Sequence, residues 1–168
     1  MCLVTYECTP KVADKDIVTY KIVERIYPKR GSLDAFIGIR FKAIHYREQK
    51  YAPNILYTAT RFRRKLTRCA KGHDPKRNKY CTPAYCTEGG FYSYENFEDA
   101  MGHMEYYRNA YYGSRLASSR FAIIKCVIPK GTEYYISAQP HIGDKGAVLC
   151  SALIKVTAYM NNKKWITK

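Results

Sequence analysis

The chain has 168 residues, close to the size of one average domain, and we expect a single domain over residues 1–168. Hydrophobic residues make up 46% of it, enough to bury a core, which excludes a disordered tail. The formal net charge is +15, from 29 lysines and arginines against 14 acidic residues, and a field of that sign attracts polyanions.

No apolar run approaches the roughly 18 residues that a membrane-spanning helix requires, so we expect no membrane partner. The first residues, MCLVTYECTPKVADKD, do not place a basic segment before an apolar one, so we expect no secretory leader. The seven cysteines are odd in number and dispersed along the chain. Free thiols in a reducing compartment are the simplest interpretation.

Three strands are predicted in the first third of the chain. Residues 16–27 are rich in β-branched and aromatic side chains, and the turn PKRG follows them. Residues 35–46 alternate between apolar and basic side chains, which predicts a half-buried strand with a basic outer face. Residues 54–62 form the third predicted strand.

A long loop is predicted over residues 63–90. This segment has no clean period and contains Pro75, Pro83 and a pair of glycines. Structureless loops of this length are unusual in compact domains, and those that occur are often functional. We therefore expect this loop to contribute to function.

Positive charge is concentrated at the start of this loop and within it. Between residues 61 and 79 there are nine basic residues and one acid, Asp74. The basic residues are Arg61, Arg63, Arg64, Lys65, Arg68, Lys71, Lys76, Arg77 and Lys79. Lysine and arginine neutralise phosphates, and interleaved tyrosines such as Tyr80 and Tyr85 can stack on bases or fill a protein interface. This segment is the predicted anion-binding site for DNA or an acidic protein surface, and the alternative is a solvated basic face.

One helix is predicted over residues 96–112, where apolar side chains recur at three-and-four spacing. Asn96 can cap its start, with Glu98 and Asp99 in the first turn at the positive end of the helix dipole. Gly113 suits the position just past the helix end.

Strands return after the helix. Residues 120–131 are almost entirely apolar, which predicts a central strand buried on both faces. Residues 132–138 predict a short strand, and residues 147–160 predict one last strand or a strand pair. The element order indicates an α+β fold with a mixed or mainly antiparallel sheet and one principal helix.

Two segments of the second half carry a family resemblance. The sequences EGGFYSYENFEDA (88–100) and AIIKCVIPKGTEYY (122–135) together resemble a family of small uncharacterised proteins of bacteriophages and mobile elements, notably crAss-like phages of gut Bacteroidales. The resemblance extends from Glu88 to about Met160 and implies a phage-encoded protein. Relatives often have a histidine after the Gly-Phe pair, where this chain has Tyr92, and that difference argues against catalysis.

A cysteine and histidine cluster lies within the predicted loop. Cys69, His73, Cys81 and Cys86 supply four possible zinc ligands in 18 residues. Zinc accepts thiolate and imidazole ligands, and its binding energy can order a loop. The spacing differs from the paired CxxC and HxxxH signatures, so the alternative is a loop with free cysteines and no cofactor.

Catalytic patterns are sparse elsewhere. Cys126 and Cys150 lie in apolar strands and are predicted to be small core residues, and His103 is predicted to have a structural role on the helix. The segments 88–91 and 132–135 can line a cleft that resembles ADP-ribosyltransferase-like folds, with Glu133 as the candidate glutamate of a nucleotide-handling enzyme. No phosphate-binding glycine loop is present.

The sequence therefore favours a protein without enzymatic activity, located in the virion or the host cytoplasm. The preferred function is a virion-associated structural or cargo component that docks through its basic, tyrosine-rich surface to other virion proteins or to packaged DNA. Trp165, the only tryptophan, is the predicted interface anchor. The alternative is an accessory phage protein that binds nucleic acid or a host defence component, and the enzyme is a third possibility.

Overall fold

The computed structural model describes residues 4–5, 9–26, 40–43, 50–52, 54–67, 84–112, 121–137, 146–161 and 164–167. The helix and strands within them are β1 (Val4–Thr5), β2 (Lys11–Val12), β3 (Ile17–Ile26), β4 (Arg40–Ala43), β5 (Lys50–Tyr51), β6 (Leu56–Thr58), β7 (Phe62–Thr67), β8 (Ala84–Gly89), β9 (Phe91–Tyr94), α2 (Phe97–Tyr112), β10 (Phe121–Ile128), β11 (Glu133–Ile136), β12 (Val148–Ser151), β13 (Leu153–Asn161) and β14 (Lys164–Ile166).

The described strands form two sheets, and every described strand pair is antiparallel. The larger sheet has the order β14-β13-β10-β3-β9-β12-β11-β2, with β4 and β6 added at its side and β5 paired to β4. The smaller sheet has the order β1-β8-β7. The predicted α+β class with a mainly antiparallel sheet is confirmed, although strands dominate. Within the described residues, no helix is both long and apolar enough to cross a bilayer.

Strands β3 and β10 form the centre of the larger sheet. They pair without interruption from Phe121 opposite Glu24 to Ile128 opposite Ile17. Successive side chains alternate between the two faces, and both faces are covered. The prediction of a strand buried on both faces is therefore confirmed for β10.

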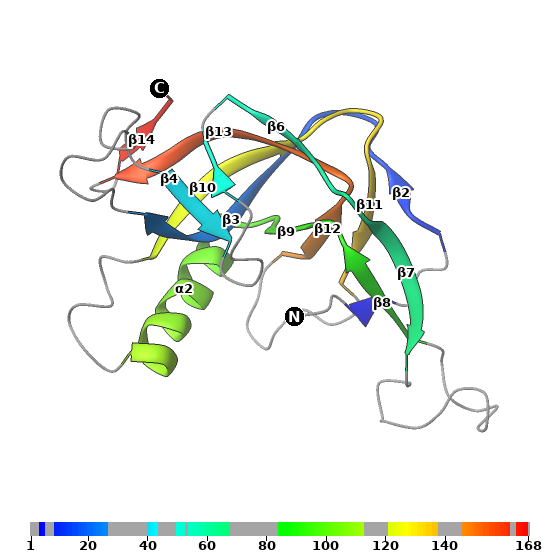
Figure 1. Cartoon of the computed structure of the whole chain (residues 1–168), viewed down its shortest axis with the longest axis horizontal. Helices are drawn as coiled ribbons and strands as arrows, with labels where there is room; N and C mark the ends of the chain where they lie inside the picture. The colour runs from blue at the N-terminus through cyan, green and yellow to red at the C-terminus, as the bar shows by residue number, and fades with distance from the viewer. Residues whose placement is uncertain are drawn as a thin grey trace.

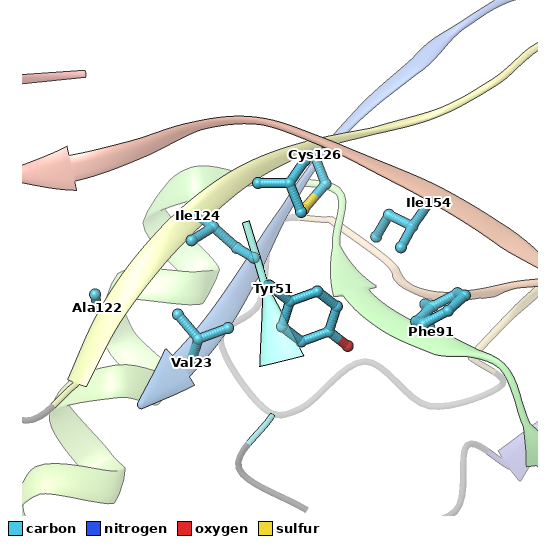
Figure 2. Packing of buried hydrophobic residues seen from close by; sticks show 8 residues of the cluster. Val23, Tyr51, Phe91, Ala122, Ile124, Cys126 and Ile154 are labelled. Atoms are coloured by element: carbon cyan, nitrogen blue, oxygen red, sulfur yellow. The ribbon is translucent and has the colours of Figure 1, made fainter. Parts of the chain in front are cut away.

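The inner face of the sheet holds the main core. Val23, Ile124 and Cys126 lie on it, and Tyr51 and Phe91 close over them (Figure 2). The rings of Tyr51 and Phe91 meet edge to face, with their centroids 6.5 Å apart. This core joins β3, β10 and β13 to β5 and β9, so segments far apart in sequence stabilise one another.

Helix α2 covers the opposite face of β3 and β10 (Figure 1). Its buried side chains Ala100, Met104 and Tyr107 pack against Ile22 and Ile123. This is the face that the three-and-four spacing predicts, so the helix expected over 96–112 is confirmed.

The start of α2 is capped as predicted and is also tied to a distant segment. Asn96 Oδ1 accepts a hydrogen bond from the Glu98 main-chain nitrogen at 2.9 Å. Asp99 Oδ2 accepts one from the Gly146 nitrogen at 2.7 Å, and Glu95 Oε2 accepts one from the Ala147 nitrogen at 3.1 Å. The residues just before β12 therefore fix the position of the helix.

The larger sheet bends where β2 leads into β3 and β10 leads into β11. The Ala13 nitrogen donates to the Thr132 oxygen at 3.0 Å, and the Gly131 nitrogen donates to the Ala13 oxygen at 2.8 Å. Strand pairing therefore continues through the bend, from β3–β10 into β2–β11. The bend brings β11 and β12 round to β9, which returns to β3 through one bridge, Tyr20 opposite Tyr94.

The prediction of a loop over residues 63–90 is wrong at both ends of the segment, where the structure has strands. β7 and β8 occupy its two ends and pair from Phe62 opposite Gly89 to Thr67 opposite Ala84. Three of the six residues of β7 are arginine or lysine, so the apolar alternation that marks a strand is absent, and backbone pairing with β8 holds the strand in place. The strand expected over 54–62 is also shorter, since β6 spans Leu56–Thr58.

The last segment, residues 147–160, is a strand pair, the second of the two predicted alternatives. β12 and β13 are separated only by Ala152, whose nitrogen donates to the Glu133 oxygen at 3.0 Å. Of the strand predicted over 35–46, the described residues contain β4 alone.

Candidate functional site

The basic cluster begins on a β-hairpin formed by β7 and β8, which we call the basic hairpin. β7 is the last strand in the order β1-β8-β7, so in the described part of the chain its outer edge carries no strand partner. Arg61 and Arg63 are exposed, and Arg64 and Lys65 follow in β7. Four of the five residues from 61 to 65, which lie in this edge strand or just before it, are therefore basic.

The base of the basic hairpin is anchored to the larger sheet. Thr87 is buried, and its hydroxyl lies 2.9 Å from the Tyr92 hydroxyl, which also donates to the Thr87 main-chain oxygen at 3.0 Å. The Phe62 and Tyr135 rings pack with their centroids 5.4 Å apart. In Figure 1 the basic hairpin lies at the opposite end of the molecule's long axis from α2 and β14. Its base is thus a fixed support rather than a free loop.

Many predicted site residues lie outside the described residues. These are Arg68, Cys69, Lys71, His73, Lys76, Arg77, Lys79, Tyr80 and Cys81. Tyr85 and Cys86 are backbone positions of β8, where Tyr85 pairs with Leu66 and Cys86 with Lys65. Over the described ranges no three metal-ligating side chains come together, so zinc at Cys69, His73, Cys81 and Cys86 stays a prediction.

Trp165 lies on β14 and packs against its own chain. Its ring centroid is 6.0 Å from that of Tyr20 on β3 and 5.8 Å from that of Phe97 on α2. The side chain nevertheless keeps 37% of its surface exposed. The contacts hold the ring in one orientation, and its predicted role as an interface anchor stays a prediction.

The remaining catalytic candidates are dispersed. Glu133 is exposed at the start of β11. Phe91 and Tyr134 both pair with Ser151, so the segments expected to line a cleft lie on either side of β12. His103 stacks on Tyr94 at 5.0 Å, which agrees with a structural role.

A lysine lies on the inner face of the larger sheet. Lys21 is half-buried on β3, and its Nζ donates a hydrogen bond to the Tyr92 main-chain oxygen at 2.7 Å. The same nitrogen lies 5.7 Å from the centroid of the Tyr51 ring. Cys126 is buried nearby on β10, as predicted for a core cysteine.

Burial controls the ionisation of Lys21 and of the thiols that act on it electrostatically. Loss of hydration lowers the pKa of Lys21 from 10.5 to about 8. The same effect raises the pKa of Cys126 to about 12 and that of Cys150 to about 11. Burial also raises the pKa of the Tyr51 hydroxyl. At neutral pH the thiols are therefore protonated, and the lysine is the charged group among them.

Sequence reasoning placed Lys21 in a strand and gave it no role. The available indication was its position in IVTYKIVERI, where the spacing places it on the same side of the strand as Thr19 and Val23. A lysine facing inward on a covered strand is unusual, because lysine is rarely buried without a partner. Recognising it required knowing that both faces of β3 are covered.

Comparisons of the chain were made with models of protein families, with curated proteins and with solved structures. None of the three finds a match.

Proposed function

We propose that this protein is a non-enzymatic docking protein that binds an anionic partner through the basic hairpin. The observation that carries the proposal is the position of Arg61, Arg63, Arg64 and Lys65 on or beside an edge strand. Nucleic acid is the preferred partner and an acidic protein surface is the alternative, within a virion-associated role.

Three physical features support this proposal. The net charge of +15 favours encounter with polyanions. An anchored strand holds its residues at a fixed rise of about 3.3 Å, with alternate positions on one face, so the order of its basic positions is fixed in a way that a free loop does not provide. Main-chain groups on an open strand edge can also bind phosphate oxygens, as backbone N–H groups do in protein–DNA interfaces.

The test is a salt titration of nucleic-acid binding. Neutralising Arg63, Arg64, Lys65 and Arg68 together should weaken binding and flatten the dependence of affinity on salt, because fewer counterions are released. The matched control neutralises four exposed lysines elsewhere, Lys15, Lys130, Lys155 and Lys164, with the same loss of charge. Equal effects of the two variants would show that only net charge matters and would overturn a site at the basic hairpin.

The virion role needs a separate measurement. Mass spectrometry of purified phage particles should find peptides of this chain in stoichiometric amounts if it is a structural or cargo component. Its absence from particles, together with early expression, would favour the accessory protein that binds nucleic acid or a host defence component. Salt-sensitive capture of an acidic protein, without nucleic-acid binding, would favour the protein partner.

A further inference from the structure

Three buried hydroxyls on the larger sheet have no hydrogen-bond partner among the residues that the structure describes. Thr19, Ser93 and Ser151 are each 0% exposed, and their side-chain oxygens are unpaired. Buried polar groups are nearly always hydrogen-bonded, so each exception calls for an explanation such as a missing water or ion. A fourth unpaired hydroxyl, that of Thr132, lies just before β11, whereas these three lie on the adjoining strands β3, β9 and β12.

Strand pairing places all three hydroxyls on the inner face. Thr19 pairs with Cys126, and Ser151 pairs with Phe91, and both of these partners belong to the main core. Directly paired residues share a face of a sheet. Ser93 follows Phe91 by two positions on β9, so alternation places it on the same face.

Lys21 lies among these hydroxyls. It stands on β3 between Thr19 and Val23, two positions from each, and therefore shares their face. The bridge from Tyr20 to Tyr94 places Ser93 opposite Lys21 in the register of β3 and β9. Ser151 is a diagonal neighbour of Ser93 on the next strand, because Leu149 pairs with Ser93 directly.

No carboxylate of the described residues pairs with the charge of Lys21. Of the residues that the structure describes, only the Tyr92 main-chain oxygen accepts a hydrogen bond from its Nζ, although an ammonium has three protons to donate. The electrostatic influences that favour its charged form come from Cys126 and Cys150, and both thiols are protonated at neutral pH. Buried lysines are almost always paired with a carboxylate or another anion.

In the described part of the chain, one edge of β3 has no paired strand at Lys21 and Ile22. β9 pairs with β3 only at Tyr20, and β4 occupies the same edge of β3 from Val23 onward. Lys21 therefore stands between the two partner strands, and it stays half-buried while Thr19 and Val23 beside it are fully buried. Of these three residues on the inner face, Lys21 alone keeps part of its surface exposed.

We propose that the inner face around Lys21, Ser93 and Ser151 is a binding site for a small oxyanion, either a phosphate or a carboxylate. The ammonium supplies the opposite charge and the hydroxyls supply neutral hydrogen-bond donors. Water alone would satisfy the hydroxyls but would leave the lysine without a counter-ion. A divalent cation does not fit, because its preferred carboxylate ligands do not approach this lysine among the described residues.

The experiment measures thermal unfolding of the full chain at pH 7 and constant ionic strength, with chloride replaced stepwise by phosphate or by acetate. A ligand that binds only the folded state raises the melting temperature as its concentration increases. Wild-type protein should show this rise with at least one of the two oxyanions, and the more effective one identifies the ligand class. No rise with either would overturn the proposal.

Two variants and a control make the test specific to this site. Lys21→Met should abolish the oxyanion-dependent rise, and Ser93→Ala should weaken the apparent affinity by about tenfold. Ser93→Ala should keep or raise the melting temperature in chloride, because it removes an unpaired buried hydroxyl. If Ser93 had only a structural role, its replacement would not lower the oxyanion response while leaving the melting temperature in chloride intact. The control, Arg61→Ala with Arg63→Ala on the basic hairpin, should keep the full rise.

An unchanged oxyanion response in both Lys21→Met and Ser93→Ala would contradict the site. Loss of the response in the hairpin control alone would assign the effect to the basic hairpin, which would also overturn this proposal. If Lys21→Met fails to fold, the oxyanion response of Ser93→Ala alone tests the site, and an unchanged response would contradict it. The polyanion titration of the basic hairpin variants is a separate measurement, so either proposal can fail without the other.

Discussion

The amino group of Lys21 on β3 donates a 2.7 Å hydrogen bond to the main-chain oxygen of Tyr92, 71 residues further along the chain. The two strands share a single backbone bridge, between Tyr20, which precedes Lys21, and Tyr94, which is two residues after Tyr92. Next to this bridge, the Lys21 side chain donates to the Tyr92 carbonyl, which in a continuous sheet would accept a hydrogen bond from a main-chain nitrogen of the neighbouring strand. The lysine therefore helps to hold the sheet where its strands separate.

The first prediction concerns the pH dependence of stability. The pKa of Lys21 is lowered from 10.5 to about 8 in the folded protein, a shift worth roughly 3 kcal/mol. Between these values the unfolded chain binds the proton and the folded protein does not, so this group makes stability rise with pH. Below pH 8 the penalty is fully present.

Replacement of Lys21 by Met isolates this contribution in denaturant unfolding experiments. Tyr51 and Tyr57 have raised pKa values that oppose the rise at high pH, but they titrate in both proteins and cancel in the difference. The charge of Lys21 lowers the pKa values of Cys126 and Cys150, yet with pKa values of about 12 and about 11 both thiols stay largely protonated in the folded protein up to pH 10.5. Between pH 8 and pH 10.5, the stability of wild type should rise by roughly 3 kcal/mol relative to that of Lys21→Met. A difference that is constant with pH would refute a shifted lysine.

The second prediction compares two glycines that share a left-handed backbone. Gly90 has a φ of +80°, and a Cβ there would lie 2.6 Å from the Cys150 sulfur; Gly131 has a φ of +81° and open space around that position. Gly131→Ala should cost about 1 kcal/mol from backbone strain alone. Gly90→Ala should cost about 3 kcal/mol or more, because overpacking is added.

Thermal or urea unfolding of both variants checks this, with Gly131→Ala as the matched control. Equal losses of unfolding free energy in the two variants would mean that the close approach of Gly90 to β12 does not contribute to the cost of the substitution. The contrast also tests the junction between β8 and β9, where the Gly90 nitrogen donates to the Arg61 oxygen at 2.9 Å.

The third prediction separates docking from catalysis. If the exposed part of Trp165 anchors a partner, Trp165→Ala should weaken association by about thirtyfold, equivalent to about 2 kcal/mol, whereas Glu133→Gln should have no effect. Partner capture or particle assembly supplies the readout, with His73→Ala alongside. Because Trp165 also contacts Tyr20 and Phe97, the fold of the variant is first confirmed by thermal unfolding.

The opposite pattern would favour the enzyme. An unaffected Trp165→Ala variant beside an inactive, folded Glu133→Gln variant would remove the case for docking. It would make the glutamate on β11 the site to pursue.

The fourth prediction concerns the reactivity of the two core cysteines. Burial raises the pKa of Cys126 to about 12 and that of Cys150 to about 11, and alkylating reagents react with the thiolate. In native protein at pH 7.5 neither should be modified by iodoacetamide over a period that fully labels the urea-unfolded chain. Peptide mapping by mass spectrometry makes the comparison, and rapid labelling of Cys126 in native protein would contradict its burial.

The helix and the central strands were predictable from sequence because their burial follows a local period. Ala100 and Met104 recur at helical spacing, and β10 is apolar almost throughout. The basic hairpin was not predictable in the same way. Arg63 and Arg64 carry no apolar alternation, and the pairing of β7 depends on β8, which lies about twenty residues away.

The two candidate sites also differ in whether the sequence alone could reveal them. The basic cluster was visible because charge density is a property of composition. Lys21 was not, because its importance arises from β9, β10 and β12, which surround it only after folding. Similarly, the unpaired state of Ser93 and Ser151 is a property of their three-dimensional surroundings, which no residue pattern encodes.

The position of β3 has a consequence for how the chain folds during synthesis. Apart from the short β4, the strands that pair with β3 begin at Phe91 or later, and so does the helix that covers it. Most of the central strand must therefore wait for about a hundred further residues before its permanent neighbours exist, and such non-local pairing slows folding. An N-terminal fragment ending before β10 should consequently be prone to aggregation, and a nascent chain should depend on chaperones until its second half emerges.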